Sequence, residues 1–372
     1  MKKRDAVLVY AETQSNDNTF KTIDLDIVDP VSALYLEFDA TNSTDDNEDN
    51  FISDIITKIE IVDGSDVLYS LPLDMLEALY FYKTKNMPTM FPSEWIGGHQ
   101  RHGCYLLFGR YLWDREYAID FSRYKNPQLK INWNLAAIRA VGTDGFATGT
   151  LQITVIAKVM EDVPAPGKYL MAKELLSFTS SSTSTAEERK EMPVDRPWRF
   201  LMTRHWVEGS DVDEVTSDLK MTCDADKYIP FDRKVKQLDA EALAIFGPIM
   251  YKHDVHRGGS CTIRVIPNKE PHATFYPQDP GQPKMIVLWA QWSSNINLEL
   301  YDSAGALDGT DRDLTGWILG HAMHATVPHV LGEMDKPDTW FDPTPYKKIE
   351  LVFTSGGTAG TCEVVLEQVR TQ

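Results

Sequence analysis

Three short stretches of this 372-residue sequence gather residues that could bind a metal. Imidazole nitrogens and thiolates are ligands that zinc and copper favour. The stretches hold His99, His102 and Cys104; His253, His256 and Cys261; and His321, Met323, His324 and His329. The first two stretches recur because the chain repeats itself, and neither has an evident full set of four ligands. We therefore favour histidines in loops or subunit contacts, and expect no metal site.

Other residue patterns that could carry chemistry are weaker. Asp63-Gly64 and the stretch from Asp302 to Asp313 could supply a carboxylate pair for glycoside hydrolysis or a calcium loop, but acidic turns are expected in so acidic a chain. The glycine-rich stretches near Gly149 and Gly360 lack the strand-to-helix context of a phosphate loop. No Gly-x-Ser-x-Gly motif occurs. We expect no catalytic residue and no cofactor.

The charge of the chain bears on its partners. Lys and Arg number 37 and Asp and Glu 55, for a net charge of −18. Nucleic-acid binding depends on Lys and Arg that neutralise phosphates, so direct binding to DNA or RNA is not expected. The one basic cluster is Lys2, Lys3 and Arg4. A solvated terminus is the simpler interpretation of this cluster, and contact with an anionic lipid surface is the alternative.

Composition indicates a globular protein of two domains. The chain is 42% hydrophobic and 25% charged, which is typical of a globular protein. It is longer than chains that usually fold around a single hydrophobic core. Its apolar runs are shorter than the ~20 residues of a membrane helix, and the terminus does not resemble a signal peptide, so synthesis in a cytoplasm is expected. Its 4 cysteines do not form a disulfide pattern.

The elements that must position these residues are mainly strands. Ile131 and Trp133 alternate with Asn132 and Asn134, which is the period-2 pattern of a sheet with one buried face. The same alternation marks 23–27, 34–38 and 151–155, and further strands are expected at 6–10, 55–62, 105–112 and 117–121. One short helix is expected over 71–82, with Pro72 near its first position.

The chain contains the same pattern twice. Residues 127–155 and 345–366 each place a strand, a glycine-rich turn, Gly-Thr and a second strand in that order, and we interpret each as a hairpin. Leu71-Pro72-Leu73-Asp74 has an echo in Ile229-Pro230-Phe231-Asp232. His99 to Cys104 has an echo in His253 to Cys261. Most of the extra length of the second copy would then follow Cys261.

Composition divides the two copies. Residues 1–163 form the first module, 164–196 a connecting segment, and 197–372 the second module with a long loop insertion. Pro164-Ala-Pro166-Gly167 stops the preceding strand. A helix over 169–176 and an exposed Ser/Thr-rich loop over 177–185 are expected in the connection. The insertion holds strand-like segments at 285–289 and 296–301.

Many short strands and no βαβ rhythm predict an all-β fold of two tandem eight-stranded jelly rolls, with short helices and with long loops in the second roll. At this point the sequence resembles the double jelly-roll major capsid proteins of tailless icosahedral viruses, the lineage of PRD1-like phages and adenovirus. The resemblance rests on the strand, Asp63-Gly64 turn and Leu-Pro-Leu-Asp helix start, on their echo at 230–243, and on the two Gly-Thr endings.

The resemblance implies a structural role in a virion and no enzymatic activity. It implies a homotrimer of roughly hexagonal outline that tiles an icosahedral capsid, with long loops outside the shell. Minor capsid or penton proteins would be further partners. Members of the family often enclose a lipid membrane, so Lys2, Lys3 and Arg4 are candidates for contact with that membrane or with the inner side of the shell. A long amphipathic terminal helix, present in some relatives, is lacking here.

Two other functions stay open. Some copper monooxygenases also combine two jelly rolls with His and Met ligands, so a two-domain jelly-roll metalloenzyme is one alternative. A carbohydrate-binding jelly roll is the other, with Trp340 and Phe341 as residues that could stack on sugars. Aromatic residues at subunit contacts are expected for the capsid function, and the candidates are Trp95, Trp113, Trp206 and Trp340.

Overall fold

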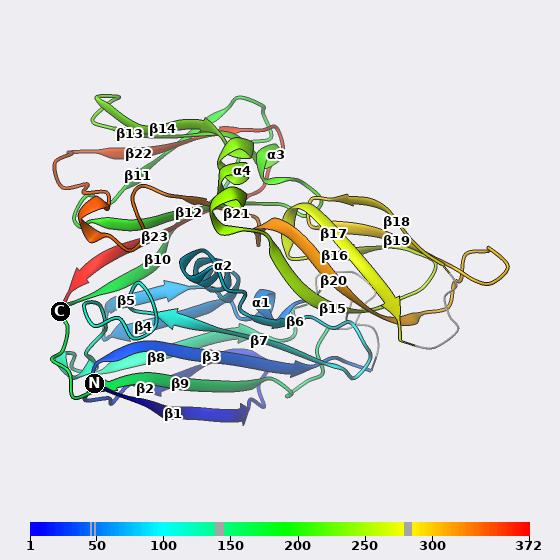
Figure 1. Ribbon diagram of the computed structural model, residues 1–372, viewed down its shortest axis with the longest axis horizontal. Helices are drawn as coiled ribbons and strands as arrows, with labels where there is room; N and C mark the ends of the chain where they lie inside the picture. The colour runs from blue at the N-terminus through cyan, green and yellow to red at the C-terminus, as the bar shows by residue number, and fades with distance from the viewer. Residues whose placement is uncertain (45–46, 48–49, 138–144, 279–284) are drawn as a thin grey trace.

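Two β rolls lie one above the other, and a smaller β insertion projects from one end (Figure 1). The computed structural model describes residues 1–44, 47, 50–137, 145–278 and 285–372. Both termini lie at the end of the molecule opposite the insertion (Figure 1). This arrangement confirms the predicted all-β double jelly roll.

The first roll consists of two antiparallel sheets that face each other. Strands β1, β9, β3, β7 and β6 form one sheet in that order, and β2, β8, β4 and β5 form the other. The chain crosses between the two sheets at most of its connections, as in a jelly roll, but β4 and β5 are neighbours in one sheet and β6 and β7 are neighbours in the other. The strands are β1 (Lys2–Thr13), β2 (Asn18–Asp24), β3 (Val31–Thr41), β4 (Lys58–Asp63), β5 (Asp66–Leu71), β6 (Thr89–Phe91), β7 (His99–Leu107), β8 (Pro127–Asn134) and β9 (Gln152–Glu161).

The second roll repeats this strand order. Strands β10, β23, β12 and β21 form one sheet, and β11, β22, β13 and β14 form the other. Strand by strand, these orders match β1-β9-β3-β7 and β2-β8-β4-β5. The strands are β10 (Lys168–Thr179), β11 (Glu187–Met192), β12 (Trp198–Trp206), β13 (Thr216–Cys223), β14 (Tyr228–Lys234), β21 (Thr326–His329), β22 (Ile349–Ser355) and β23 (Thr361–Thr371).

The two rolls share one continuous sheet. Ser70 of β5 bridges Lys173 of β10 in parallel, which joins the second sheet of the first roll to the first sheet of the second roll. The hydrophobic core is continuous across this boundary, because Met171, Phe200 and Met202 belong to the same buried cluster as the first roll. The rolls are therefore packed as one body.

Four helices occur in the described residues: α1 (Ile52–Ile55), α2 (Leu73–Thr84), α3 (Val212–Val215) and α4 (Val235–Phe246). The helix expected over 71–82 is confirmed as α2, with Pro72 at its N-cap. It is not the only helix, since α4 follows β14 as α2 follows β5. No described helix is long and apolar enough to cross a membrane.

The insertion lies between α4 and β21. It holds two three-stranded sheets, β15-β20-β17 and β16-β19-β18. The two strands expected at 285–289 and 296–301 are confirmed as β18 and β19, joined by a turn in which Ser293 and Ser294 have φ of 53° and 66°. The strands are β15 (Ile249–Arg257), β16 (Ser260–Arg264), β17 (Pro267–Pro277), β18 (Met285–Trp292), β19 (Asn295–Tyr301) and β20 (Arg312–Met323).

Several local predictions are wrong. The two repeated endings are not hairpins: β8 pairs with β2 and β4, while β9 pairs with β1 and β3 in the other sheet. Strands β22 and β23 separate in the same way. The helix expected over 169–176 is part of strand β10. The segment expected to connect the rolls, 164–196, thus supplies β10 and β11, the first two strands of the second roll.

The expected equivalence of His99–Cys104 with His253–Cys261 is also wrong. Strand β7 corresponds to β21, whereas His253 lies on β15 in the insertion. The insertion begins at Ile249, before Cys261. No regular strand forms over 117–121, where only Ile119 bridges Val31.

Candidate functional site

A buried ion cluster joins the two rolls where α2 lies between them (Figure 1). Glu367 on β23 accepts hydrogen bonds from Lys83 of α2 and from Arg199 of β12, the latter at 2.5 Å. The side chains of Glu367 and Arg199 are 0% exposed, and that of Lys83 is 2% exposed. Burial would raise the pKa of Glu367, but the charges and hydrogen bonds of Lys83 and Arg199 outweigh burial and lower it. The carboxylate therefore stays ionised.

A second buried cluster links α2 to the end of the insertion. One oxygen of Glu77 lies 2.8 Å from Nδ1 of His102 on β7, and the other lies 2.8 Å from Nε2 of His324. Burial would raise the pKa of Glu77, but the charges and hydrogen bonds of the two histidines outweigh it and hold the pKa below its ordinary value. The cluster ties first-roll residues to the turn that leads into β21.

A third cluster lies beside the N-terminal end of α2. Arg204 of β12 pairs with Asp74 of α2 at 2.8 Å and with Glu363 of β23 at 3.1 Å. Nearby Glu174 has a pKa of about 7, raised by burial and by the charges of Glu363 and Asp74. These contacts place charged groups from both rolls along one helix. Together the three clusters make α2 the structural junction of the molecule.

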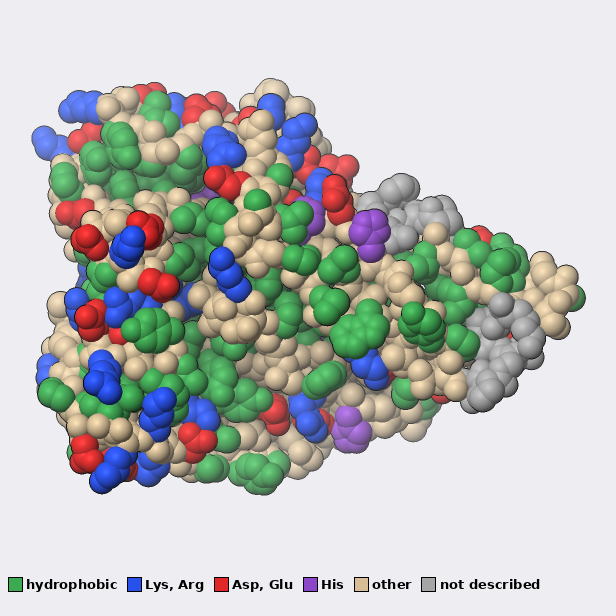
Figure 2. Space-filling view, in the orientation of Figure 1, with side chains coloured by type: hydrophobic (Ala, Val, Ile, Leu, Met, Phe, Trp, Pro, Cys, Tyr) green, Lys and Arg blue, Asp and Glu red, His purple; other side chains and the backbone are tan. Residues whose placement is uncertain are grey.

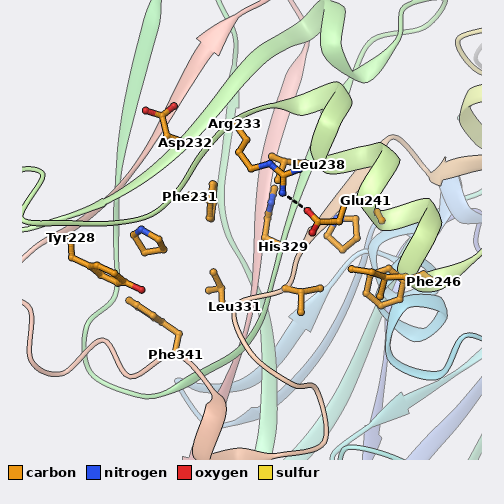
Figure 3. Close-up of a pocket in the computed structure, with 15 residues that line it drawn as sticks. Tyr228, Phe231, Asp232, Arg233, Leu238, Glu241, Phe246, His329, Leu331 and Phe341 are labelled. Carbon is orange, nitrogen blue, oxygen red and sulfur yellow. Dashed lines mark hydrogen bonds and ion pairs between the residues drawn. The ribbon is translucent and has the colours of Figure 1, made fainter.

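A pocket of about 290 Å³ opens between α4, β14 and the residues after β21 (Figure 3). Phe231 and His329 stack in it, with ring centroids 5.2 Å apart and planes 9° apart. Arg233 and Glu241 form an ion pair at its wall (Figure 3). Phe341 contributes a further ring. The pocket is thus lined by aromatic and aliphatic groups, by the Arg233–Glu241 ion pair and by the acidic residue Asp232.

The histidine of this pocket, His329, is poorly suited to acid–base catalysis. Burial lowers the pKa of His329 to about 3, so its ring is neutral and a weak base at neutral pH. The described residues that line the pocket include no Ser, Thr, Cys or Lys that could act as a nucleophile.

The structure does not bring the sequence-predicted metal ligands together. On β7, His99 points outward to Asp39 while His102 and Cys104 point inward, because alternate residues of a strand face opposite sides. On β15, His253 is buried and His256 contacts Asp313 of β20, while Cys261 lies on another strand.

The third stretch is divided in the same way. His321 pairs with Asp239, His324 with Glu77, and His329 with Thr203, while Met323 is buried in the core. In the part of the chain that the structure describes, no group of three or more His, Cys, Asp or Glu side chains could hold a metal ion.

The predicted acidic sites act as turn acceptors. Asp63 accepts hydrogen bonds from the backbone N–H groups of Lys125 and Asn126. Asp302 accepts them from Ala304 and Ala306 in the insertion. Each carboxylate therefore satisfies backbone donors of a neighbouring loop or turn.

The four tryptophans predicted to lie at subunit contacts differ in their burial. Trp95, Trp113 and Trp206 are partly exposed, whereas Trp340 is 7% exposed. The Trp340 ring packs on Tyr117, and its N–H donates to the backbone of Glu333. Trp340 is therefore a core residue, and its ring is not presented for stacking on a sugar.

The basic terminus is part of strand β1 and is not a loose tail. Lys2 pairs with Asp162 at 3.0 Å, and Arg4 pairs with Glu161 at 2.6 Å. Lys3 lies over the Trp113 ring, 5.0 Å from its centroid. Figure 2 shows Lys and Arg side chains gathering toward the end of the molecule that carries the termini.

Sequence reasoning missed the residues that matter most at the junction. Lys83, Arg199, Glu367 and Glu77 all carry charge within stretches of apolar residues. A charged residue that interrupts an apolar run is the signal that could have found them, since such a group needs a partner when buried. Which partner it finds depends on the packing of the rolls.

Comparison with known proteins identifies the fold. No family model matches the sequence, and no curated protein matches it. Among solved structures, the STIV major capsid protein matches with a TM-score of 0.61 and 9% identity, over 99% of this chain and 96% of that chain. The PBCV-1 virus capsid structure matches with a TM-score of 0.55 and 8% identity, over 99% and 93%.

The major capsid protein P2 from bacteriophage PM2 matches with a TM-score of 0.53 and 10% identity, over 100% of this chain and 98% of that chain. At such low identity the similarity shows the fold alone. That fold is the double jelly roll of major capsid proteins of tailless icosahedral viruses, and the matches span nearly the whole chain.

Proposed function

We propose that this protein is a major capsid protein, a structural subunit whose homotrimers tile an icosahedral virion shell. The observation that carries the proposal is the repeated roll: two units whose eight strands follow the same order, apart from the extra β6 in the first, are joined side by side through one sheet. Three such chains supply six similar sides, and repeated symmetric contacts give a closed lattice without strong individual interfaces. The similarity in fold to capsid proteins over nearly the full chain supports this function.

In this function the protein works by assembly and not by catalysis. Its location is the virion, after synthesis in the host cytoplasm, and its principal partner is itself. Minor capsid or penton proteins would complete the shell. The insertion would face outward and the termini inward, because they lie at opposite ends of the molecule (Figure 1).

Assembly of the purified chain tests this function. Concentrated full-length protein, incubated across a range of salt concentrations that screens its net charge of −18, should form shells or flat arrays with threefold symmetry, visible by negative-stain electron microscopy. Protein that stays folded and dispersed under every condition would contradict the proposal.

We further propose that Lys2, Lys3 and Arg4 contact an internal membrane or the inner side of the shell. Each cation near an anionic bilayer contributes about 1 kcal/mol, and Glu161 and Asp162 offset part of this. A K2Q/K3Q/R4Q variant should bind vesicles containing phosphatidylserine about tenfold more weakly than wild type, as measured by flotation.

The matched control for the basic terminus is R189Q/K190Q on β11 of the second roll, where Arg189 is exposed and Lys190 is partly exposed. The control should bind vesicles as wild type does. Equal binding by all three proteins would show that the basic terminus makes no specific membrane contact.

A further inference from the structure

The outer face of the β15-β20-β17 sheet of the insertion presents an exposed tryptophan ring. Trp317 of β20 is 52% exposed, and the other tryptophans whose side chains the structure describes are buried or partly buried. Its side chain makes no hydrogen bond, ring contact or cation–π contact with another described residue. Figure 2 shows hydrophobic side chains gathered over this sheet. A large ring without a partner on an exposed apolar patch is typical of an interaction site.

Strand register places eight side chains around this ring. Trp317 is paired with Lys252 on one side and with Thr274 on the other, and alternate residues of each strand point to the same face. The neighbours are Met250, Lys252 and Asp254 on β15, Thr315 and Leu319 on β20, and His272, Thr274 and Tyr276 on β17. All eight are exposed or partly exposed. We call Trp317 and these eight residues the Trp317 face.

The opposite side of the sheet is fixed in the hydrophobic core. Val255 of β15, Ile318 of β20 and Phe275 of β17 all belong to the buried cluster that extends through the first roll. Gly316 allows this close packing, because a Cβ at that position would clash with the ring of Phe275. The Trp317 face is therefore a rigid platform, and a ligand that binds to it does not have to order the backbone.

The Trp317 face combines apolar and hydrogen-bonding groups. Tyr276 is 59% exposed and adds a second ring, while Met250 and Leu319 add aliphatic surface. The hydroxyl groups of Tyr276 and Thr274 make no hydrogen bond with another described residue, like the indole N–H of Trp317. A ligand with both an apolar side and hydroxyl groups at its rim would satisfy all of these groups.

The charges of the Trp317 face are already paired. Lys252 lies 3.0 Å from Asp254, which also accepts a hydrogen bond of 2.7 Å from the hydroxyl of Thr315. An anionic ligand would have to compete with Asp254 for Lys252, and a cationic ligand would have to compete with Lys252 for Asp254. The chain as a whole carries a net charge of −18, so this local balance favours an uncharged ligand.

The Trp317 face is small for a stable protein partner. Strands about 4.8 Å apart with a rise of about 3.4 Å per residue give three strands of three outward residues an area of about 300 Å². A stable protein–protein interface takes about 800 Å² from each partner. The area, the mixed chemistry and the paired charges together fit a short, uncharged, amphipathic chain.

We propose that the Trp317 face binds a neutral oligosaccharide. A pyranose ring with equatorial hydroxyls has C–H groups on its two faces, which stack on the indole of Trp317, and hydroxyls on its rim. Tyr276 is the diagonal neighbour of Trp317 across the strand pair, roughly 7–8 Å away, so a second sugar unit stacks on its ring. Thr274 and Asp254 meet the hydroxyls at the rim. This function goes beyond the proposed capsid function, and the site itself does not depend on it.

The display of the site does rest on the proposed capsid function. A flat face encloses little of its ligand, so one site should bind with a dissociation constant on the order of 1 mM. The insertion lies at the end of the molecule opposite the termini, so a shell would present the Trp317 face outward in many copies (Figure 1). Repetition raises the avidity for a surface that carries the same sugar many times.

A printed array that carries cellohexaose, chitohexaose, N-acetyllactosamine and sialylated N-acetyllactosamine tests the proposal with labelled full-length protein. At least one of the three neutral probes should retain the protein, and the sialylated probe should not retain it better. Ligand-observed NMR titration with the retained probe should give a dissociation constant at least tenfold higher for W317A and for Y276A than for wild type. W317F keeps a ring and should lie between wild type and W317A.

The matched control is Y10A, which removes a tyrosine that is 76% exposed on β1 of the first roll and should bind as wild type does. Far-UV circular dichroism checks that each variant is folded. Retention of none of the neutral probes, or equal binding by W317A and wild type, overturns the sugar site.

Native mass spectrometry separates this proposal from the capsid function. W317A should have the same oligomeric mass as wild type. Loss of the oligomer in W317A would identify the Trp317 face as a contact between copies and overturn the sugar site, while the capsid function stands. A wild-type monomer whose sugar binding depends on Trp317 would support the sugar site and contradict the capsid function.

Discussion

Replacement of Glu367 by glutamine should destabilise the protein by about 3–5 kcal/mol, the usual cost of removing one partner from a buried ion cluster. The amide keeps the shape of the side chain but leaves Lys83 and Arg199 without an anion, at positions almost closed to water. Urea unfolding at one fixed protein concentration measures the effect, because stability of an assembled protein depends on concentration.

The matched control for Glu367 is an exposed pair of the same type. Glu187 and Arg189 on β11 lie 3.0 Å apart with side chains 52% and 53% exposed, so E187Q should change stability by less than about 1 kcal/mol. Equal effects of E367Q and E187Q would show that the junction between the rolls does not depend on the buried cluster.

Acidification from pH 7 to pH 5 should destabilise the fold through three buried histidines. Burial lowers the pKa of His205, His253 and His329 to about 3, whereas an unfolded histidine has a pKa of about 6.5. Below pH 6.5 the unfolded chain therefore binds protons that the folded chain does not, and stability falls as pH falls. Each histidine should cost about 2 kcal/mol at pH 5.

One buried carboxylate acts in the opposite direction. The pKa of Glu174 is raised to about 7, so the folded state binds its proton first and gains stability as pH falls toward the ordinary value for glutamate. The net loss at pH 5 is therefore smaller than the sum over the histidines. Urea unfolding at several pH values between 7 and 5 measures this net change.

His253 offers a variant that isolates the histidine contribution. Neither ring nitrogen of His253 makes a hydrogen bond among the described residues. Glu94, whose carboxylate lies 3.8 Å from Nε2, also pairs with Arg257, so leucine can replace His253 and leave that carboxylate its cation. The stability of H253L should fall less steeply with acidification, by about 1.4 kcal/mol per pH unit between pH 6 and pH 4. A slope equal to that of wild type would contradict the buried neutral ring.

Local pattern was enough to predict much of the fold. The alternation at Ile131 and Trp133 correctly places both residues in the core, and Pro72 correctly marks the start of α2. The order of the repeated segments correctly predicts two rolls. These features depend on residues close in sequence, where backbone geometry and burial act over a few positions.

Pairing between distant strands could not be predicted in the same way. The glycine-rich turns after β8 and β22 look like hairpin turns, yet each chain segment crosses to the opposite sheet. Which sheet β9 joins depends on the fold of the whole roll, because β9 pairs between β1 and β3. The sequence of 169–176 predicts a helix, but the segment forms a strand because it pairs with β23, which is also distant in sequence.

The candidate sites could likewise be predicted only as far as residues close in sequence determine them. The sequence showed groups of neighbouring histidines. In the structure His99 and His102 point to opposite sides of strand β7, and His102 and His321 instead contact carboxylates that are distant in sequence, Glu77 and Asp239. The buried cluster at Glu367 joins residues from α2, β12 and β23, which only the packed rolls bring together.

The proposed capsid function depends most directly on three copies of one two-roll chain forming a hexagonal unit. Native mass spectrometry of the purified full-length protein, combined with negative-stain class averages, tests it in one preparation. We predict a mass three times that of the 42.2 kDa chain and an outline with six similar sides. A monomer, or a dimer with twofold symmetry, would contradict the account.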